Sequence, residues 1–472
     1  MHPLVVDLDG TLILTDMLHE SILRLLRDRP WDLITFPGWL SRGKAVFKKE
    51  VAEYADIDYA ALPYNQPFLE WLREEKEKGR TIVLCTASDQ KFAQAIANYL
   101  GLFDEVIASD GKQNMSGEVK ASELVKRFGL QQFDYAGNSK DDLPVWQKAQ
   151  TAIVVNARPS LLEEARKSSK VERVFPAKQY TFKTWLRVFR VHQWLKNILL
   201  FATCLAAHRL GNGEDWINLI IAFVSFGFCA SVVYITNDLL DLDSDRLHPR
   251  KQTRPFASGD VPVALGVMLT PVLLIMSMLL AYCVSPGFLN WLLVYFILTS
   301  AYSFKLKRMV LIDCIVLALL YTLRVIAGAA AISSPLSFWL LALSVFLFLS
   351  LAFVKRCAEL QVQTDAGNEK THGRGYYTSD TSLIQILGVV SGYISVLVLA
   401  LYINSGDVQK LYHAHEIIWF AVPVLLFWVS WIWLKVQRRE MNDDPVMFAI
   451  KDPTSLVTGA IFLSVFYLGT MY

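Results

Sequence analysis

The chain has 472 residues and a formal net charge of +2, and 53% of its residues are hydrophobic. This length is too great for one domain, and this hydrophobic content excludes a purely soluble protein. Up to about residue 183 the hydrophobic residues alternate with charged ones, as in a globular α/β protein, and after Trp194 they run together. We therefore expect a soluble α/β part followed by an all-α membrane part, with no nucleic-acid partner.

The soluble part opens on a short buried strand, residues 4–6, that ends in two acids. The sequence DLDGT follows directly at residues 7–11. This stretch resembles the opening motif of the haloacid dehalogenase (HAD) superfamily of phosphohydrolases. The resemblance implies a Rossmann-like sheet in which Asp7 is the nucleophile that takes up the phosphoryl group and Asp9 is the general acid and base. Both groups would also face Mg²⁺.

Three further stretches follow in the order of that superfamily. A second buried strand ends at Thr86, which matches the phosphate-binding hydroxyl, and Lys120 matches the lysine that neutralises phosphoryl oxygens. The sequence GNSKDDLP at residues 137–144 resembles the acidic Mg²⁺ loop, with Asp142 as its second acid. The first acid of that loop is replaced by Asn138, whose amide oxygen can ligate Mg²⁺ without charge. The domain is therefore an active phosphatase or, as the alternative, a pseudo-phosphatase.

The insertion between the first two strands, residues 12–79, has helical periodicity interrupted at Pro30 and Pro37. It is expected to form a helical cap, which in this superfamily usually limits the enzyme to small phosphorylated substrates. We assign residues 1–175 to this domain and the basic residues 176–190 to a linker beside anionic lipid. The first residues lead straight into a strand without a signal peptide, so this domain is expected in the cytoplasm.

The membrane part, residues 191–472, contains about nine apolar segments, several near the roughly 20 residues that a bilayer requires. These segments are residues 194–207, 216–236, 261–283, 288–304, 309–331, 336–354, 383–403, 417–434 and 453–472. Alternate connections are rich in lysine and arginine, and the remaining ones are nearly free of them. The positive-inside rule then places the N-terminal domain in the cytoplasm of a bacterial-type inner membrane protein.

A cluster of acids lies at the end of the apolar run 216–236. Asp238, Asp241 and Asp245 are spaced i, i+3 and i+7, so on one continuous helix they would share a face, whereas Asp243 would point elsewhere. Three convergent carboxylates suit Mg²⁺, which commonly carries a phosphate ligand as well. The alternative is a solvated acidic helix cap, but acids do not favour a helix C-terminus.

With its neighbours, this cluster resembles the first signature of the UbiA prenyltransferase superfamily. The match begins at Asn237 and continues through HPRK at residues 248–251 to RPFASG at residues 254–259. The resemblance implies an all-helical intramembrane bundle in which Mg²⁺ on the aspartates binds a diphosphate. Nearby basic residues would offset the remaining charge of the diphosphate. The candidates are Arg246, Lys251 and Arg254.

Most members of the superfamily carry a second pair of aspartates after the sixth span, and this chain has KRCAEL at residues 355–360 in that place. Together with HQWLKN at residues 192–197 and Arg324 inside an apolar segment, this pattern resembles the branch that makes polyprenyl-phosphoryl-5-phosphoribose. In that branch 5-phosphoribosyl diphosphate donates the sugar to a polyprenyl phosphate. The resemblance implies a further set of substrate-binding residues: Gln193, Lys196, Asn197, Asn237, Arg324, Lys355, Arg356 and Glu359.

The two parts suggest one pathway, in which the membrane part makes a lipid-linked ribose 5-phosphate and the HAD-like part removes a phosphate. One rival is ordinary prenyl transfer from a prenyl diphosphate to an aromatic or other acceptor. Another is a non-catalytic membrane protein whose HAD-like domain only binds a phosphorylated metabolite. The sequence leaves the lipid chain length, the substrate of the HAD-like domain and the oligomeric state open.

Overall fold

The computed structural model describes the whole chain except residues 371–373, 407, 409–411, 413–414, 442–443 and 472. The chain divides into two compact units. The first unit comprises Met1–Arg190 together with Tyr234–Val272, and the second comprises Val191–Val233 together with Leu273–Tyr472. The segment that carries the aspartates thus belongs to the same unit as the N-terminal domain. The predicted boundaries at residues 175 and 191 stay a prediction.

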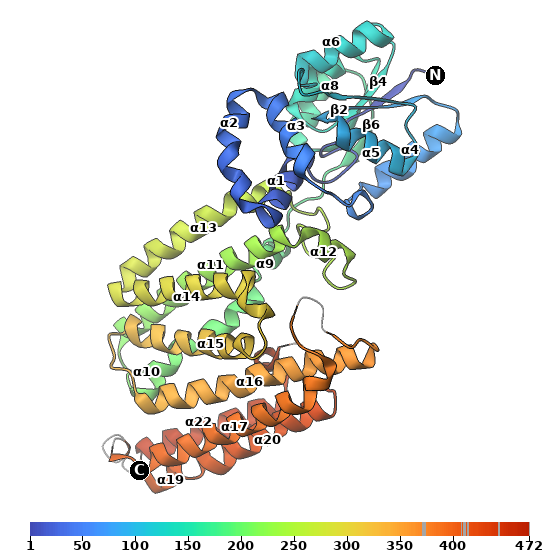
Figure 1. Cartoon of the computed structure of the whole chain (residues 1–472). Helices are drawn as coiled ribbons and strands as arrows, with labels where there is room; N and C mark the ends of the chain where they lie inside the picture. Colours follow the sequence, from blue (N-terminus) through green and yellow to red (C-terminus); the bar gives the residue numbers. More distant parts are fainter. Residues whose placement is uncertain (371–373, 407, 409–411, 413–414, 442–443, 472) are drawn as a thin grey trace. The chain divides into compact units, whose positions relative to one another are not determined.

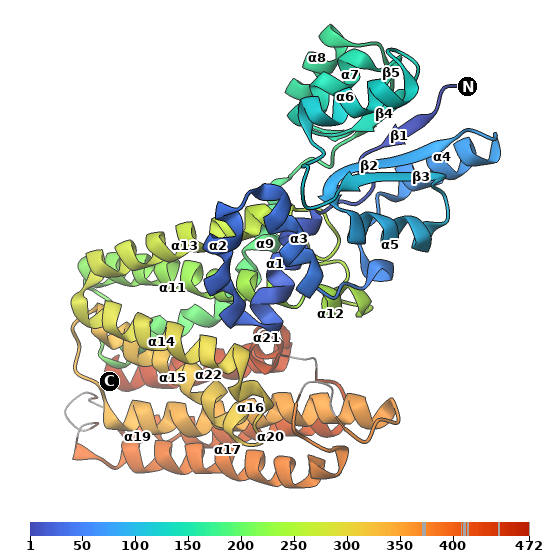
Figure 2. The same cartoon turned by 45° about the horizontal axis from the view of Figure 1, so that its top comes forward.

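A six-stranded parallel sheet forms the centre of the first unit, in the order β3-β2-β1-β4-β5-β6. Figure 2 shows β3, β2, β1 and β4 of this sheet side by side. Its strands are β1 (Leu4–Val6), β2 (Ile82–Asp89), β3 (Glu105–Ser109), β4 (Asp134–Gly137), β5 (Thr151–Ala157) and β6 (Val171–Pro176). Leu4 pairs with Ile82 of β2 and with Asp134 of β4. The carboxyl ends of these three central strands therefore lie side by side, which places the residues that follow them at one edge of the sheet.

Helices cover both faces of this sheet. One core contains Leu4 and Val6 with side chains from α4 (Gln66–Glu77) and α5 (Gln90–Leu100). The opposite core contains Val5 with side chains from α6 (Gly117–Phe128), α7 (Leu143–Lys148) and α8 (Pro159–Ser168). Burial on both faces explains the short continuous apolar runs of the strands. The predicted α/β fold of this part is confirmed.

The predicted helical insertion is also present. It contains α1 (Met17–Asp28), η1 (Pro30–Thr35), α2 (Phe36–Ser41), α3 (Lys44–Tyr54) and η2 (Tyr59–Ala61), followed by α4. The side chain of Asp16 caps α1 by accepting hydrogen bonds from two backbone amides. Pro30 and Pro37 stand in the first turns of η1 and α2, where a missing N–H is tolerated. The two prolines therefore divide the insertion into short helices.

The remaining elements of the first unit lead to and from the aspartates. They are η3 (Lys140–Asp142), α9 (Phe182–Val188), the end of α11 (Gly213–Leu240), α12 (Leu242–Leu247) and the start of α13 (Val263–Val284). Asp241 stands between α11 and α12 with φ −99° and ψ 15°, outside regular helical geometry. The aspartates are thus carried by two helices, and the single helical face that the spacing predicted is interrupted.

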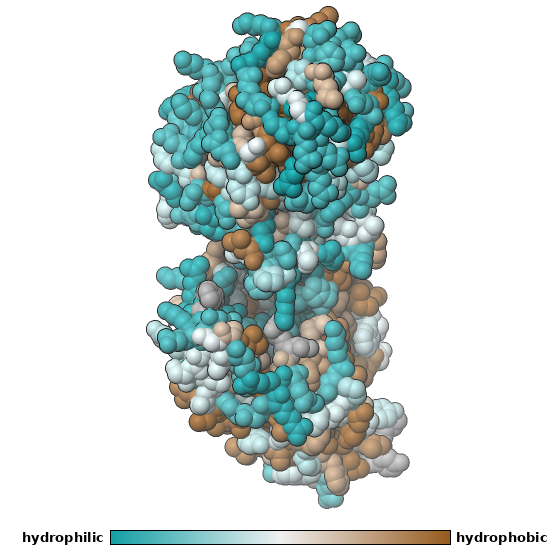
Figure 3. All heavy atoms as spheres, turned by 90° about the vertical axis from the view of Figure 1, so that its right-hand side faces the viewer, coloured by the Kyte–Doolittle hydropathy of each residue, from teal (hydrophilic) through white to brown (hydrophobic). Residues whose placement is uncertain are grey.

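The second unit is built from helices (Figure 1). Besides most of α11 and α13, it contains η4 (Val191–Phe201), α10 (Ala202–Ala206), α14 (Pro286–Phe304), η5 (Leu306–Arg308), α15 (Ile312–Ala331), α16 (Phe338–Asp365), η6 (Thr378–Asp380), α17 (Thr381–Ile403), α19 (His415–Ile418), α20 (Ala421–Gln437), α21 (Pro445–Lys451) and α22 (Pro453–Met471). On the face shown in Figure 3, hydrophobic residues gather mainly over these helices, and the sheet domain is largely hydrophilic.

Eight helices in the described part of the chain are long and apolar enough to cross a membrane. The all-α membrane bundle is thus confirmed, with the predicted nine spans an approximate number. The first predicted span, residues 194–207, forms η4 and the five-residue helix α10. Lys196 and Asn197 are buried within η4, so this segment carries polar groups inside the helical unit instead of a continuous apolar surface.

Candidate functional site

The first candidate site lies at the carboxyl ends of β1, β2 and β4. The Nζ of Lys120, from α6, donates hydrogen bonds to Asp7 Oδ1 at 2.9 Å and to the hydroxyl of Tyr135 at 2.8 Å. That hydroxyl donates to Asp142 Oδ1 at 2.7 Å. Burial raises the pKa of Asp7 to about 6, although Lys120 opposes the shift. The structure therefore brings together the predicted nucleophile, lysine and second acid, and adds Tyr135 as a bridge.

Asp9 is held on the other side of this site. It accepts hydrogen bonds from the backbone N–H of Met17 at 2.9 Å and from the hydroxyl of Ser88 at 2.6 Å. Burial, reinforced by the nearby carboxylate of Asp16, raises the pKa of Asp9 to about 7. A carboxyl group with this pKa still carries its proton in a large fraction of molecules near neutral pH, as a general acid requires. Thr86 is fully buried and accepts from the Ser88 backbone N–H at 3.0 Å.

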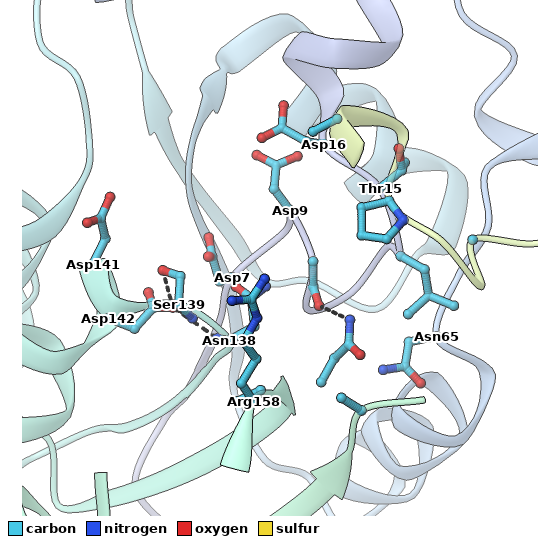
Figure 4. Close-up of a pocket in the computed structure, with 18 of the residues that line it drawn as sticks. Asp7, Asp9, Thr15, Asp16, Asn65, Asn138, Ser139, Asp141, Asp142 and Arg158 are labelled. Carbon is cyan, nitrogen blue, oxygen red and sulfur yellow. Dashed lines mark hydrogen bonds between the residues drawn. The ribbon is translucent and has the colours of Figure 1, made fainter. Parts of the chain in front are cut away.

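The acidic loop departs from the arrangement that the motif predicted. Both oxygens of Asp142 are engaged, because Oδ2 accepts from the backbone N–H groups of Asn138 and Ser139, each at 2.9 Å. Figure 4 shows Asn138 beside Asp7, with Asp142 joined to the loop and Asp141 turned away. Gly10, with φ +73°, leaves room for the Asn138 side chain, since a Cβ there would lie 2.9 Å from its Cγ.

The residues of this first site were predicted to hold Mg²⁺. Across the residues that the structure describes, no group of three His, Cys, Asp or Glu side chains is arranged to hold a metal ion. The reason at this site is that Asn138 supplies an amide in place of the third acid, while Asp142 is bound to backbone amides. The oxygen donors of Asp7, Asp9 and Asn138 still match the ligand preference of Mg²⁺.

A cavity of about 1930 Å³ opens over these residues. Lys48 of α3 lines it and donates to the carbonyl oxygen of Ala87 at 2.7 Å and to Asn114 Oδ1 at 3.1 Å. Burial lowers the pKa of Lys48. Residues 258–260 and 262–264, from the connection after the aspartates, line the same cavity. Its volume exceeds the roughly 300–1,000 Å³ of ordinary ligand pockets, so this cavity does not by itself limit the substrate to a small molecule.

The second candidate site is the aspartate cluster. Asp238 forms ion pairs with Arg190 and with Arg254, whose Nη1 lies 3.0 Å from Asp238 Oδ1, and Arg254 also pairs with Asp245. Asp245 Oδ1 is buried without a hydrogen-bond partner, and Lys251 Nζ lies 3.9 Å from it. Burial raises the pKa of Asp245 despite Arg254. A carboxylate pair with an orphaned oxygen fits a divalent cation, whose charge would compete with that of the arginines.

Two of the basic residues predicted for this cluster lie on protein carboxylates. Arg254 contacts the two aspartates, because buried carboxylates require a nearby positive charge, and its predicted role toward a diphosphate stays a prediction. Arg246 was expected beside the acids, and its guanidinium lies on Glu20 of α1. Asn237 lies in the last turns of α11, and Asp241 stands at the break that follows. The three-carboxylate metal site stays a prediction.

The third candidate site lies in the second unit around the Lys355-Arg356 pair of α16. The side chain of Arg356 is fully buried and pairs with Asp313 and Glu359. The Tyr376 hydroxyl donates to Asp313 Oδ1 at 2.5 Å, and Arg374 Nε lies 3.4 Å from Glu359 Oε2. Arg356 thus faces protein carboxylates in this structure, and its predicted role toward a substrate anion stays a prediction. Its charge is neutralised by protein carboxylates, as burial at low dielectric demands.

Lys355 has a different environment. Among the described residues no carboxylate lies within ion-pair distance of its ammonium, while Lys196 pairs with Asp444. Burial opposes ionisation of Asp444, but Lys196 outweighs it, so the pKa of Asp444 lies below its usual range. Lys355 interacts electrostatically with Lys196, Glu359, Asp444 and Arg374, so this group contains three cations and two anions. This group carries an excess positive charge that suits a phosphate.

Arg324 of α15 is held by neutral groups. Its Nε donates to Asn197 Oδ1 at 3.0 Å, and its Nη2 donates to the Tyr295 hydroxyl at 2.9 Å. The guanidinium carbon also lies 4.7 Å from the centre of the Tyr295 ring, within the range of a cation–π contact. The predicted functional arginine thus connects η4, α14 and α15. Gln193 lies in η4 as well.

Comparison with known proteins gives one family match for the N-terminal part of the chain and another for the membrane part. The model of the UbiA prenyltransferase family matches residues 198–451, and that of the haloacid dehalogenase-like hydrolases matches residues 4–147. The chain belongs to the UbiA prenyltransferase family. Its N-terminal part is HAD-like. Both resemblances that the motifs indicated are therefore confirmed.

Three relatives of this UbiA-family chain are about a third identical to it over the residues that align. An uncharacterized protein of Sinorhizobium fredii is 34% identical over 99% of this chain and 90% of its own length. The nodulation protein NoeC of Azorhizobium caulinodans is 34% identical, covering 60% of this chain and 91% of its own. The decaprenyl-phosphate phosphoribosyltransferase of Mycobacterium tuberculosis is 32% identical, covering 52% of this chain and 80% of its own.

Several residues at the sites of this UbiA-family chain were missed by sequence reasoning. Tyr135 and Ser88 stand within matched motif regions, and their hydroxyls could have been noted because each lies near the end of a central strand. Arg190 was assigned to a membrane-side linker, and nothing in its spacing indicates its contact with Asp238. Asp313 and Asp444 are likewise far in sequence from their partners, so no local signal identified them.

Proposed function

We propose that the UbiA part transfers a phosphoribosyl group from 5-phosphoribosyl diphosphate to a polyprenyl phosphate, with release of diphosphate, at a bacterial inner membrane. The observation that carries this proposal is the excess positive charge of Lys355, Lys196 and Arg374 over Glu359 and Asp444. A phosphate-bearing acceptor or sugar would neutralise this charge, whereas a neutral aromatic acceptor would leave it uncompensated. The similarity to decaprenyl-phosphate phosphoribosyltransferases supports the same choice.

In the proposed reaction an oxygen of the lipid phosphate forms a bond to C1 of the ribose, and the bond from C1 to the diphosphate breaks. Asp238, Asp241 and Asp245 would hold Mg²⁺, which would supply charge neutralisation for the departing diphosphate. Lys196 and Lys355 would hold a substrate phosphate in place. Arg254 would move from the aspartates to the diphosphate as the cation takes over its charge.

We further propose that the HAD-like part removes the 5-phosphate from the lipid-linked product. The carboxylate of Asp7 would attack phosphorus, and Lys120 would neutralise the phosphoryl oxygens. Asp9 would protonate the departing sugar oxygen and then accept a proton from the water that hydrolyses the aspartyl phosphate. Mg²⁺ on Asp7, Asp9 and Asn138 would offset the charge of the phosphate. The cavity of about 1930 Å³ gives room for the rest of a large substrate.

A second candidate function for this part is phosphate binding without turnover. It is favoured by Asn138 in the acidic loop and by the full engagement of Asp142 with Tyr135 and backbone amides. In that case the membrane part would release a product that retains its phosphate. The two candidates differ in whether inorganic phosphate appears.

The test uses the purified full chain with labelled 5-phosphoribosyl diphosphate, polyprenyl phosphate and Mg²⁺. We expect a labelled lipid and released diphosphate, followed by inorganic phosphate. Asp238→Asn should abolish the labelled lipid, and the control Asp365→Asn, which changes an exposed carboxylate paired with Arg439, should not. Absence of labelled lipid would refute the donor or acceptor, and consumption of a prenyl diphosphate would then favour ordinary prenyl transfer.

Asp7→Asn separates the two reactions within the same assay. We expect this variant to make labelled lipid at the wild-type rate and to release no inorganic phosphate from it. Unchanged phosphate release would remove Asp7 from the chemistry, and its absence in wild type as well would favour phosphate binding without turnover.

A further inference from the structure

The first helix of the cap, α1, forms a buried ion pair with the helix that carries Asp245. Arg246 of α12 donates two hydrogen bonds to Glu20 of α1, from Nη2 to Oε1 at 2.7 Å and from Nη1 to Oε2 at 3.2 Å. Each side chain is only 5% exposed. The hydroxyl of Thr15 donates to Glu20 Oε1 at 2.6 Å, and Arg246 Nε donates to the carbonyl oxygen of Ala257 at 3.2 Å.

A second ion pair lies along the same face of α1. Arg24, one turn after Glu20, pairs with Asp243 of α12, and Arg27 Nη1 lies 3.7 Å from the same carboxylate. Residues 20, 24 and 27 are spaced i, i+4 and i+7, so one face of α1 meets α12. Asp243 is the acid of the cluster that the helical spacing separated from the other three. Its partner is therefore the cap rather than a cation site.

The connection that follows α12 is also held by the N-terminal domain. Gly259 has φ +71°, and a Cβ at this position would lie 2.6 Å from the Leu14 side chain and 3.2 Å from that of Pro63. Lys178 Nζ lies 2.5 Å from Asp260 Oδ1. The N-terminal domain and the linker that follows it thus contact the segment at both ends, at residues 243–246 and at residues 259–260, and Arg254 lies between them.

These contacts matter because α12 is not continuous with α11. Regular helical geometry is lost at Asp241, although its N–H donates to the Asn237 carbonyl oxygen and its carbonyl oxygen accepts from the Asp245 N–H, each at 2.9 Å. These two hydrogen bonds and the contacts with α1 together set the position of Asp245 relative to Asp238. Arg246 is the residue next to Asp245, and its bidentate pair with Glu20 fixes the orientation of α12 about this break. An exposed ion pair would contribute little here, but a buried one leaves an uncompensated charge if either partner is lost.

We propose that the HAD-like part positions the aspartate helix of the UbiA part, with Glu20, Arg24, Asp243 and Arg246 as positioning residues for the transfer reaction. This role is independent of phosphate hydrolysis, so it persists when the hydrolytic site is inactive. It rests on the proposed function only in the choice of the transfer assay. The surface of α1 is accordingly an interface for α12 within the same chain.

The experiment compares wild type, Glu20→Gln and the control Glu163→Gln, all as full chains in detergent. Glu163 pairs with Arg166 on the surface of α8 and is 62% exposed. We expect Glu20→Gln to lower kcat/KM for transfer by roughly 10- to 100-fold, because small misplacements of reacting groups have effects of this size. Hydrolysis of p-nitrophenyl phosphate should stay within about twofold of wild type in both variants, since Glu20 does not contact Asp7 or Asp9.

Two further readouts separate positioning from a loss of folding. Amide hydrogen exchange should become faster at residues 242–258 in Glu20→Gln and stay unchanged in the strands β1 and β4. The combined charge reversal Glu20→Arg with Arg246→Glu should restore slow exchange and about half of the lost transfer, as expected for directly coupled residues. Asp243→Asn, which changes the second ion pair alone, should also speed exchange at residues 242–258 and lower kcat/KM for transfer, but by less than Glu20→Gln does.

Each outcome decides the proposal. Unchanged exchange at residues 242–258 in both Glu20→Gln and Asp243→Asn would overturn the proposal. So would an unchanged kcat/KM for transfer in a Glu20→Gln protein that hydrolyses p-nitrophenyl phosphate as fast as wild type. If wild type makes no labelled lipid, the proposed function fails while the exchange data still test the positioning. Binding of inorganic diphosphate with Mg²⁺, measured by calorimetry, then replaces transfer and should weaken by about tenfold in Glu20→Gln.

Discussion

The buried ion pair of Arg356 with Asp313 allows a structural role to be separated from substrate binding. The proposed changes are Asp313→Leu, Arg356→Met and the combination of both. In wild type neither side chain is exposed, and their charges neutralise each other. Each single variant leaves one charge buried with fewer partners, whereas the combined variant replaces the pair by two apolar side chains.

The size of the effects follows from these contacts. Losing one partner of a buried ion pair typically costs about 3–5 kcal/mol, and replacing both partners is often neutral. In Asp313→Leu the guanidinium keeps Glu359, so we expect a loss near 3 kcal/mol. In Arg356→Met the carboxylate keeps the Tyr376 hydroxyl and Arg374 Nη1 at 3.7 Å, so the loss should be of similar size. The combined variant should lie within about 1 kcal/mol of wild type.

Thermal unfolding in detergent measures these differences, with each single variant expected to melt roughly 10 °C below wild type. Transfer activity of the combined variant then tests the role of Arg356. Because protein carboxylates already neutralise the charge of Arg356, we expect the combined variant to retain most of the transfer activity. A combined variant as unstable as the single ones would refute the reasoning about the ion pair. A combined variant that is stable but inactive in transfer would indicate that Arg356 binds the substrate.

Three other predictions concern the remaining charged groups. Lys355→Ala should raise the KM for polyprenyl phosphate by about 10- to 100-fold through the loss of a charged hydrogen bond, and Lys435→Ala, which removes a surface ion pair with Glu440, should leave that KM unchanged. Burial raises the pKa of Asp9 to about 7, so the folded metal-free protein holds a proton that the unfolded chain loses above about pH 4. The difference between the thermal unfolding midpoints of Asp9→Asn and wild type should therefore move in favour of the variant from pH 4 to pH 7 and stay constant above pH 7. A difference that does not change with pH would contradict the raised pKa of Asp9. Asp245→Asn should weaken Mg²⁺-dependent diphosphate binding measured by calorimetry, and retention of full binding would exclude Asp245 as a ligand.

The sequence of this chain indicated the HAD-like fold through features that are local. Each motif follows a short apolar strand, and residues that follow the carboxyl ends of adjacent parallel strands meet at one edge of the sheet. The proximity of Asp7, Thr86 and Asn138 therefore follows from their positions at the ends of these strands. The membrane helices were predictable for a similar reason, because an apolar run of sufficient length can bury its backbone polar groups only as a helix.

What the sequence by itself determined is therefore the order of the two parts, the central strands, the helical bundle and the acids that carry the chemistry. Only the tertiary structure decided which charges neutralise one another. A carboxylate accepts any nearby cation, and Glu20 with Arg246, Arg190 with Asp238, and Asp313 with Arg356 come from elements that are distant in the chain. Burial requires that each such charge have a partner, but packing alone selects the partner, because ion pairing has no sequence spacing of its own.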